Sequence, residues 1–176
     1  MSQIIPVRTG EELHAEVLEN CLRTEIHDIP RGSLQIDQFG TGASNLTYAL
    51  KIGDWEGVLR RPPLGPVAPK AHDMEREYTI LKDLHPLFPL APKPYFFSSD
   101  ESIAGSPFFV MERRHGVLVD TELPDGMEAS QELGHSMSEL MVDTLVSLHE
   151  VPYKGTAIER LSKPDGFMER QVHGWI

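Results

Sequence analysis

The sequence contains a single cysteine, Cys21, and no long apolar segment. One cysteine excludes an internal disulfide framework and a multi-cysteine zinc site, and it fits a reducing compartment. No run approaches the roughly 20 apolar residues that a membrane-spanning helix requires. The first residues also lack the basic and apolar regions of a secretory signal. We therefore expect a cytoplasmic protein that does not enter a membrane.

Basic residues are scarce relative to acidic ones. There are 16 Lys and Arg against 27 Asp and Glu, so the formal net charge is -11 at pH 7. A surface of this sign repels nucleic acid and anionic lipid, and we expect neither as a partner. The histidines show no His-Glu-x-x-His pattern, so the sequence supports no metal site.

The order of secondary-structure signals predicts an α+β fold. A capping-box pattern from Thr9 to Glu12 predicts a first helix. Its buried face is predicted to hold Leu13, Val17 and Cys21. Alternating apolar residues and turn signals predict five strands, over residues 34–39, 46–52, 57–61, 95–97 and 107–112. Other patterns predict a helix over residues 71–85, a later helix that ends at Pro152, and another that begins near residue 167.

Small residues fill the turn between the first two strands. Gly40 and Gly42 lack side chains, so backbone amides there can approach phosphate oxygens closely, and Ser44 and Asn45 add donors. The turn is no P-loop, because it lacks a Gly-Lys-Ser/Thr ending before a helix. The next segment alternates as a strand, which disfavours a dinucleotide-binding oxidoreductase. The motif indicates either a phosphate-binding turn or a plain hairpin.

Charged residues on the third strand and on the inserted helix form a second candidate. Arg60 and Arg61 end the strand, where guanidinium groups either grip phosphates or protect an exposed edge. Glu77 falls inside the buried arc of its helix at about 100° per residue. A carboxylate on such a face needs a partner, and the nearest cations are Arg60 and Arg61. The alternative is a glutamate at the boundary of the buried stripe.

The last predicted strand, over residues 107–112, is apolar and runs directly into a linker. Its exit exposes backbone N–H and C=O groups beside an apolar wall. Such a site suits a flat heteroaromatic ring such as adenine. A core strand that simply leaves its sheet explains the apolar part equally well.

These features resemble, in order and spacing, the small lobe of the kinase fold, and more closely the aminoglycoside phosphotransferase family. The turn reads Gly-x-Ser-Asn-x-x-Tyr from Gly42 to Tyr48, as is typical of that family. Four further blocks resemble the branch of kinase-like domains found alone in bacteria and fused to acyl-CoA dehydrogenase domains elsewhere. These blocks are residues 58–63, 71–74, 76–78 and 105–112.

The resemblance implies a five-stranded antiparallel sheet with one helix, followed by the first helices of an incomplete helical large lobe. It divides the chain into a helical extension (residues 1–33), the small lobe (34–114), and a linker with the start of the large lobe (115–176). It implies ATP-binding roles for Gly40, Thr41, Gly42, Ser44, Asn45, Arg60, Glu77, Met111, Glu112 and Arg114.

Several of these roles are specific. Arg60 takes the place of the strand lysine that binds phosphates in most kinases, and Glu77 is expected to pair with it. Backbone atoms of Glu112 and Arg114 are expected to bond adenine, in a hinge that begins at Met111. Mg²⁺ is expected to bridge the phosphates, with its ligands outside this chain.

Family members also need an aspartate in a His-Gly-Asp-like segment and a later aspartate for Mg²⁺. His173 and Gly174 are followed by Trp175, and residues 165–167 carry the letters of the metal motif in the wrong order. We therefore expect no catalytic residue in this chain, which would stop before the catalytic loop.

The resemblance thus implies the ATP-binding portion of a kinase-like phosphotransferase that acts on a hydroxyl of a small molecule and is inactive alone. The branch points to a hydroxyacyl-CoA or similar acceptor. The alternative is a non-catalytic module that binds a nucleotide or a partner chain. An apolar helical face over residues 140–148 also predicts self-association.

Overall fold

The computed structural model describes residues 4–40, 44–65, 72–117, 119, 123–124, 126–162 and 165–174. The strands are β1 (Ile4–Ile5), β2 (Gln35–Phe39), β3 (Leu46–Ile52), β4 (Trp55–Arg61), β5 (Pro94–Ser98) and β6 (Phe108–Glu112). The helices are α1 (Ala15–Glu25), α2 (Met74–Leu84), α3 (Glu101–Ala104), α4 (Gln131–His149), α5 (Ala157–Ser162) and α6 (Phe167–Gly174).

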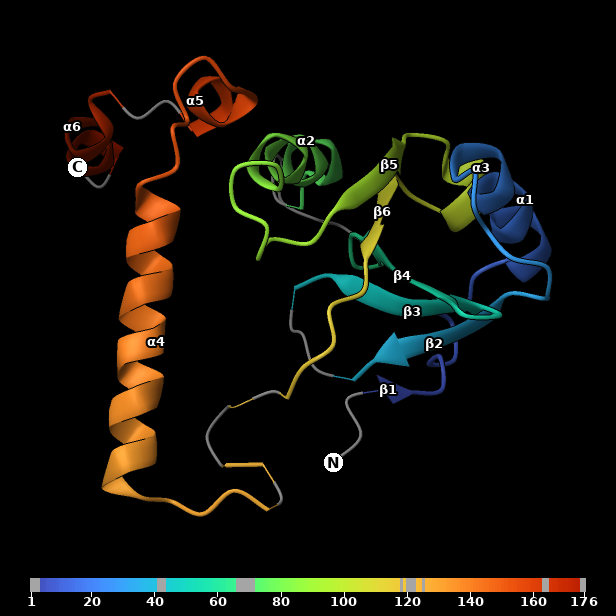
Figure 1. Cartoon of the computed structure of the whole chain (residues 1–176). Coiled ribbons are helices and arrows are strands. Elements are labelled where there is room, and N and C mark those ends of the chain that lie inside the picture. Colours follow the sequence, from blue (N-terminus) through green and yellow to red (C-terminus); the bar gives the residue numbers. More distant parts are fainter. Residues whose placement is uncertain are drawn as a thin grey trace.

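A six-stranded sheet forms the centre of the described residues. Its order is β1-β2-β3-β4-β6-β5, and each neighbouring pair is antiparallel. α1 lies beside α3, and α2 packs against β5 and β6, whereas α4 stands apart from the sheet (Figure 1). This arrangement confirms the predicted α+β fold, in which a helix is inserted into an antiparallel sheet and further helices follow.

The sequence pattern does not predict one strand of the sheet. β1 pairs Ile4 with Phe39 and Ile5 with Gln38, at the open side of β2. Two residues are too few to show a period of two, so the alternation that reveals the other strands is missing here. The N-terminal residues therefore extend the sheet as well as supplying a helix.

The first helix differs from its prediction in both start and buried face. Leu18 and Leu22 are its buried residues, and the predicted Leu13 and Cys21 are partly buried against the same core, whereas Val17 is 44% exposed. The predicted capping box is wrong, because the Glu12 carboxylate accepts a hydrogen bond from the Gly10 N–H at 2.8 Å. Gly10 adopts a φ of 87°, a left-handed conformation that turns the chain before the helix begins.

The hydrophobic core lies between one face of the sheet and the helices α1 and α3. The alternation read from β3 is confirmed, because every second side chain of this strand is buried. The Phe96 and Phe108 rings meet edge-on, with centroids 5.9 Å apart. The buried members of this core are Leu18, Leu22, Leu34, Leu46, Tyr48, Leu50, Ile52, Leu59, Phe96, Ala104, Phe108 and Val110.

α2 packs along β5 and β6 and carries a charged residue toward the sheet. Asp73 caps its first turn by accepting a backbone N–H at 2.9 Å, and Met74 is 2% exposed. The Tyr78 ring lies 6.2 Å from the Phe97 ring of β5. Because Asp73 caps the helix, α2 begins later than predicted, and Glu77 lies in its first turn.

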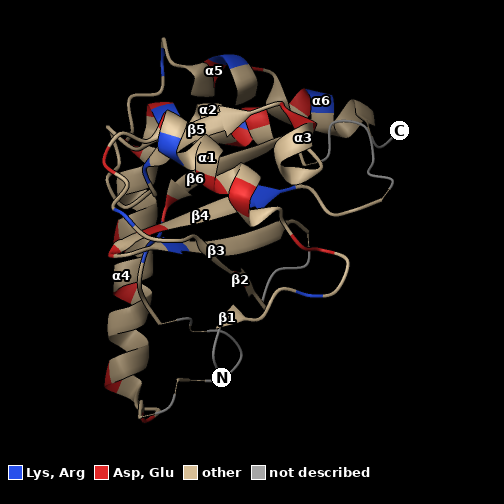
Figure 2. Ribbon diagram, turned by 90° about the vertical axis from the view of Figure 1, so that its right-hand side faces the viewer, with Lys and Arg blue, Asp and Glu red and all other residues tan. Residues whose placement is uncertain are grey.

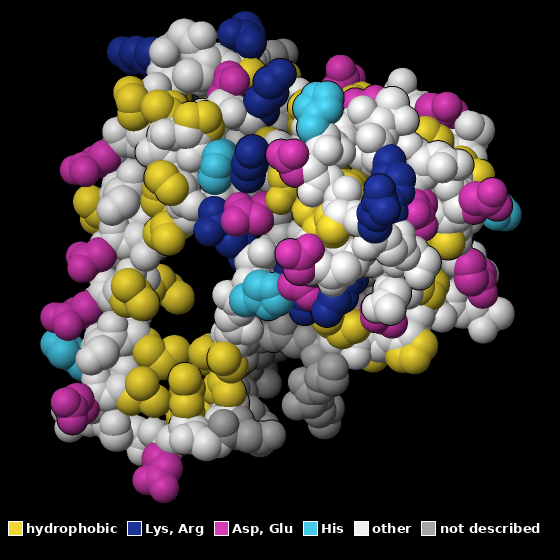
Figure 3. Space-filling model, turned by 45° about the vertical axis from the view of Figure 1, so that its right-hand side comes forward, with side chains coloured by type: hydrophobic (Ala, Val, Ile, Leu, Met, Phe, Trp, Pro, Cys, Tyr) yellow, Lys and Arg dark blue, Asp and Glu magenta, His cyan; other side chains and the backbone are white. Residues whose placement is uncertain are grey.

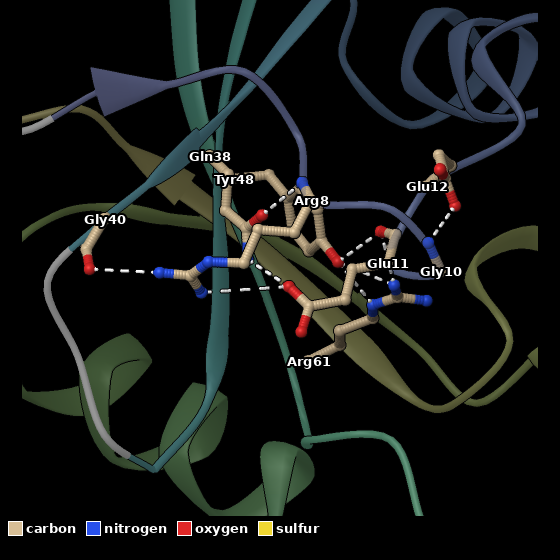
Figure 4. A network of polar contacts seen from close by, with 8 residues as sticks. All are labelled: Arg8, Gly10, Glu11, Glu12, Gln38, Gly40, Tyr48 and Arg61. Atoms are coloured by element: carbon tan, nitrogen blue, oxygen red, sulfur yellow. Dashed lines mark hydrogen bonds and ion pairs between the residues drawn. The ribbon is translucent and has the colours of Figure 1, made fainter.

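Arg61 joins three separate segments of the chain on the core side of the sheet, and Figure 4 shows its contacts with two of them, at Tyr48 and Glu11. It is 3% exposed, and both Nε and Nη2 donate to the Tyr48 hydroxyl, at 3.0 and 2.6 Å. Its Nη1 donates to the Ala104 carbonyl at 2.5 Å, and Nη2 donates to the Glu11 carbonyl at 2.8 Å. A phosphate-gripping role for Arg61 is therefore wrong, because its donors are used inside the fold.

The helices after β6 are much less covered than the sheet. None of the described residues of α4 is buried, and the helix contains Glu and Asp but no Lys or Arg (Figure 2). Hydrophobic side chains line the side of this tall helix that faces the rest of the molecule (Figure 3). α5 packs against α2, where the Ala157 N–H donates to Asp83 Oδ2 at 2.5 Å. No described helix is both long and apolar enough to cross a bilayer.

We expect the Arg61→Met substitution to lower the free energy of unfolding by about 2–4 kcal/mol, because the buried Ala104 carbonyl and the buried Tyr48 hydroxyl lose their guanidinium donors and the Glu11 carbonyl loses one of two donors. Urea denaturation followed by circular dichroism measures the change. Arg31→Met removes the same charge from an exposed turn and should change stability by less than about 0.5 kcal/mol. Equal stability of the two variants would contradict the joining role of Arg61.

A second prediction concerns Glu19, which ties α1 to the start of β2. The Leu34 N–H donates to its carboxylate at 2.9 Å, and this bond, followed by the hydrogen bond from Arg23, lowers the pKa of Glu19 below its ordinary value. A carboxyl whose pKa is lower in the folded state stabilises the fold above its unfolded pKa. That contribution disappears as the pH falls through the lowered folded pKa.

We therefore expect Glu19→Gln to be less stable than the unsubstituted chain at pH 7, with the difference shrinking as the pH falls below about 4. Thermal unfolding at a series of pH values measures this. Glu16→Gln, on an exposed position of the same helix, is the matched control. A difference that stays constant down to pH 2 would contradict the proposed charge effect.

Candidate functional site

The candidate site lies on the face of the sheet opposite to the core side of Arg61. Successive residues of a strand point to opposite faces, so Arg60 and Arg61 leave β4 on different sides. Thr47 pairs with Arg60 across β3 and β4, and Phe109 pairs with Arg60 across β4 and β6. Of the predicted glycine turn, Gly40, Ser44 and Asn45 are described, whereas Thr41 and Gly42 lie outside the described residues.

An ion pair between β4 and α2 forms the centre of this site. Arg60 Nε lies 3.2 Å from Glu77 Oε2, and the two side chains are 34% and 33% exposed. Arg60, rather than Arg61, is therefore the partner of Glu77, as the resemblance implies. Glu77 is only partly buried, so it sits at the boundary of the helix's buried stripe and not inside the core. A pair at this exposure leaves the guanidinium accessible to a ligand anion.

Asn45, at the end of the glycine turn, completes the cluster. With its amide oxygen toward Arg60, it accepts from Nε at 2.9 Å and from Nη2 at 2.8 Å, while its nitrogen donates to His72 Nδ1 at 2.5 Å. The opposite orientation keeps contacts to Glu77 at 3.3 Å and to His72 at 2.5 Å, but it points the amide nitrogen at a guanidinium, which offers donors only. The first orientation therefore gives the guanidinium an acceptor that the opposite one lacks.

His72 is a member of the cluster that sequence reasoning missed. It precedes the cap of α2 and has a φ of 58°, which makes it the one described residue other than glycine with a positive φ. A left-handed conformation is uncommon for a residue with a side chain and is concentrated at functional sites. No periodicity or spacing marks such a residue, because its partner Asn45 lies 27 residues before it in the sequence.

An apolar floor adjoins the ion pair on the same face of the sheet. The strand register pairs Ala49 with Val58 and Val58 with Met111, so these side chains lie side by side on the face of Arg60. Ala49 and Val58 are each 6% exposed, and Phe109 is fully buried. A floor of this kind beside a cation can take a molecule with a flat ring and an anionic tail.

Side chains hold the exit of β6 in place. The Glu112 N–H donates to the Lys93 carbonyl at 2.8 Å, and the Glu112 carboxylate binds the Lys93 N–H and Arg114 Nη2, each at 3.1 Å. Arg114 Nη2 also donates to the Pro89 carbonyl at 2.6 Å. These side chains fasten the loop before β5 and do not reach Arg60. The roles of the Glu112 and Arg114 backbone toward an adenine ring stay predictions.

Glu56, which the sequence did not single out, fastens the same linker from β4. It pairs with Arg113 Nη1 at 2.9 Å and with His115 Nε2 at 2.6 Å. The two bonds fix the direction in which the chain leaves the sheet beside Met111. No sequence pattern indicated this contact, since Glu56 lies 57 residues before Arg113 and meets the linker only through the pairing of β4 with β6.

The described residues fit a nucleotide better than a metal ion. A partly exposed guanidinium, an amide and an apolar floor supply donors for phosphates and a surface for a base. Within the described ranges, no three His, Cys, Asp or Glu side chains gather as a metal ion would require.

The chain is similar to part of several acyl-CoA dehydrogenase family members. It is 34% identical over 148 residues to acyl-CoA dehydrogenase family member 11 of Gallus gallus, which covers 83% of this chain and 18% of that protein. It is 32% identical over 171 residues to acyl-CoA dehydrogenase family member 10 of Mus musculus, which covers 97% of this chain and 16% of that protein. The chain thus spans less than a fifth of these curated relatives.

A solved structure and a family match agree with this similarity. The crystal structure of a Ralstonia eutropha protein assigned as an aminoglycoside phosphotransferase superposes with a TM-score of 0.74 at 29% identity, over 93% of this chain and 46% of that one. Residues 35–176 match the phosphotransferase enzyme family. That match covers most of the chain, including Arg60, Glu77 and the strands that hold them, and the chain therefore belongs to the phosphotransferase enzyme family.

Proposed function

We propose that this chain is the nucleotide-binding part of an ATP-dependent phosphotransferase that transfers the γ-phosphate to a hydroxyl of a small molecule. The observation that carries the proposal is the Arg60–Glu77 ion pair, with Asn45 of the glycine turn bound to the same guanidinium. Membership of the phosphotransferase family supports the general class of reaction. The choice of ATP rests on the cation and apolar floor on one face of the sheet.

Each residue of the candidate site has a definite role in this proposal. Arg60 binds phosphate oxygens in the place of a strand lysine, and its planar fork can hold two of them. Glu77 and Asn45 contact Nε and Nη2 of the guanidinium, and its remaining N–H groups would bind the ligand. Backbone groups of Glu112 and Arg114 would bond the base above the floor. Phosphoryl transfer depends mainly on such positioning and on charge neutralisation.

The transfer step itself is proposed to need residues outside these 176. The sequence contains no His-Gly-Asp-like segment, and the described residues hold no metal cluster. The acceptor is proposed to be a hydroxyacyl-CoA or a similar small hydroxyl compound. The basis is the resemblance to domains of proteins that are named as acyl-CoA dehydrogenase family members.

Substituting Arg60 tests the phosphate role directly. We expect Arg60→Ala to weaken Mg-ATP binding about 10- to 100-fold, the equivalent of losing one or two charge-assisted hydrogen bonds. Arg60→Lys keeps the charge but not the planar fork, so its affinity for Mg-ATP should lie between those of the unsubstituted chain and Arg60→Ala. Isothermal titration calorimetry of the 176-residue chain measures the dissociation constants.

Arg76→Ala is the matched control, because it removes the same charge from an exposed position of α2. Equal affinities of Arg60→Ala and Arg76→Ala for Mg-ATP would sink the proposed phosphate role. Phosphate transfer from ATP to any acceptor by this chain alone would contradict the proposal that the transfer residues lie elsewhere. If a longer natural form of the protein binds Mg-ATP but transfers no phosphate, the non-catalytic alternative is favoured.

We expect the ion pair to add little to the stability of the fold. Both side chains are about one-third exposed, so solvent screens their attraction. A double-mutant cycle with Arg60→Ala and Glu77→Ala, read by urea denaturation, should give a coupling free energy of about 1 kcal/mol or less. A coupling of about 3 kcal/mol would instead identify the pair as a structural element of the core.

A further inference from the structure

The β2 end of the glycine turn is held by residues that precede α1. β1 pairs with β2 as far as Phe39, and the Arg8 N–H donates to Gln38 Oε1 at 3.0 Å. The Arg8 side chain runs along β2, and its Nη2 donates to the Gly40 carbonyl at 3.2 Å (Figure 4). A guanidinium from the N-terminal segment thus contacts the last described residue before the turn.

Arg8 is itself held by a buried amide and an acid. Gln38 is 1% exposed, and the oxygen and nitrogen of its side-chain amide each form a hydrogen bond with the N-terminal segment. Its oxygen accepts from the Arg8 backbone, and its nitrogen donates to Glu11 Oε2 at 2.6 Å. Glu11 Oε2 lies 3.8 Å from Arg8 Nη1, which directs the guanidinium toward Gly40.

Glu11 connects this arrangement to the core. Its carbonyl accepts the Tyr48 hydroxyl at 2.7 Å and Arg61 Nη2 at 2.8 Å. Tyr48 and Arg61 are almost fully buried, so they hold the Glu11 carbonyl from within the core. A continuous set of polar contacts therefore runs from the core through Glu11 and Arg8 to the carbonyl of Gly40.

We propose that Arg8 is a positioning residue for the phosphate site. Gly40 is the last described residue before the turn, so a donor that holds its carbonyl restrains the end of β2 from which the turn begins. The family match begins at residue 35, so this contact comes from residues before the matched part of the chain. The inference rests on the proposed function of Gly40 and Asn45 as part of a nucleotide site.

Two measurements on Arg8→Ala test the inference. Isothermal titration calorimetry with Mg-ATP should show about threefold to tenfold weaker binding. Hydrogen–deuterium exchange without nucleotide should be faster in peptides that span the β2–β3 turn and unchanged in β4 and β6. The unfolding midpoint should hardly move, because the Arg8 side chain is 47% exposed. Arg31→Ala, an exposed arginine after α1, controls for the lost charge.

The two readouts separate this inference from the proposed function. If the unsubstituted chain binds no Mg-ATP, the proposed function fails, while exchange at the turn still decides whether Arg8 restrains it. The positioning role would be overturned if the unsubstituted chain binds Mg-ATP and Arg8→Ala shows the same affinity and the same exchange rates. A uniform rise of exchange over all strands would also overturn it. If Arg8→Ala does not fold, Arg8→Met, which keeps most of the side-chain length and removes its donors, is measured in the same way with the same expected results.

Discussion

The alternation of side chains along β4 is the constraint on which the rest of this structure depends. It sends two consecutive arginines to opposite faces of one sheet. Arg61 enters the core and binds neutral acceptors from three segments, while Arg60 leaves on the other face and meets Glu77. One strand thereby supplies both the central connection of the fold and the central cation of the candidate site.

The two faces differ in what surrounds their arginine. Arg61 is 3% exposed and every contact described for it is to an uncharged oxygen or to the Tyr48 ring, so its charge is compensated by dipoles. Arg60 is one-third exposed and has a carboxylate partner. A buried guanidinium with satisfied donors is a structural element, whereas a partly solvated one beside a glycine turn is available to an anion. The same residue type therefore carries two different physical tasks.

Much of this arrangement can be read from the sequence because it depends on local patterns. The alternation in β3 and the apolar run of β6 were sufficient to place both strands. The helical period placed Glu77 on the sheet side of α2, and proximity then left two possible partners. The start of α1 was predicted too early, and of its predicted buried residues Leu13 and Cys21 pack against the core whereas Val17 is exposed. β1 was not predicted, because a strand of two residues cannot show the alternation of apolar and polar side chains.

The sequence by itself determined the order of the five longer strands and of α2 among them, the glycine turn and the presence of an acid facing strand cations, because each follows from spacings within a few residues. Only the tertiary structure decided between Arg60 and Arg61, brought Asn45 and His72 to the guanidinium, and joined Arg8 to Gly40. The physical reason is that these contacts link residues far apart in the chain. Their geometry is set by strand register and helix placement, which no local pattern encodes.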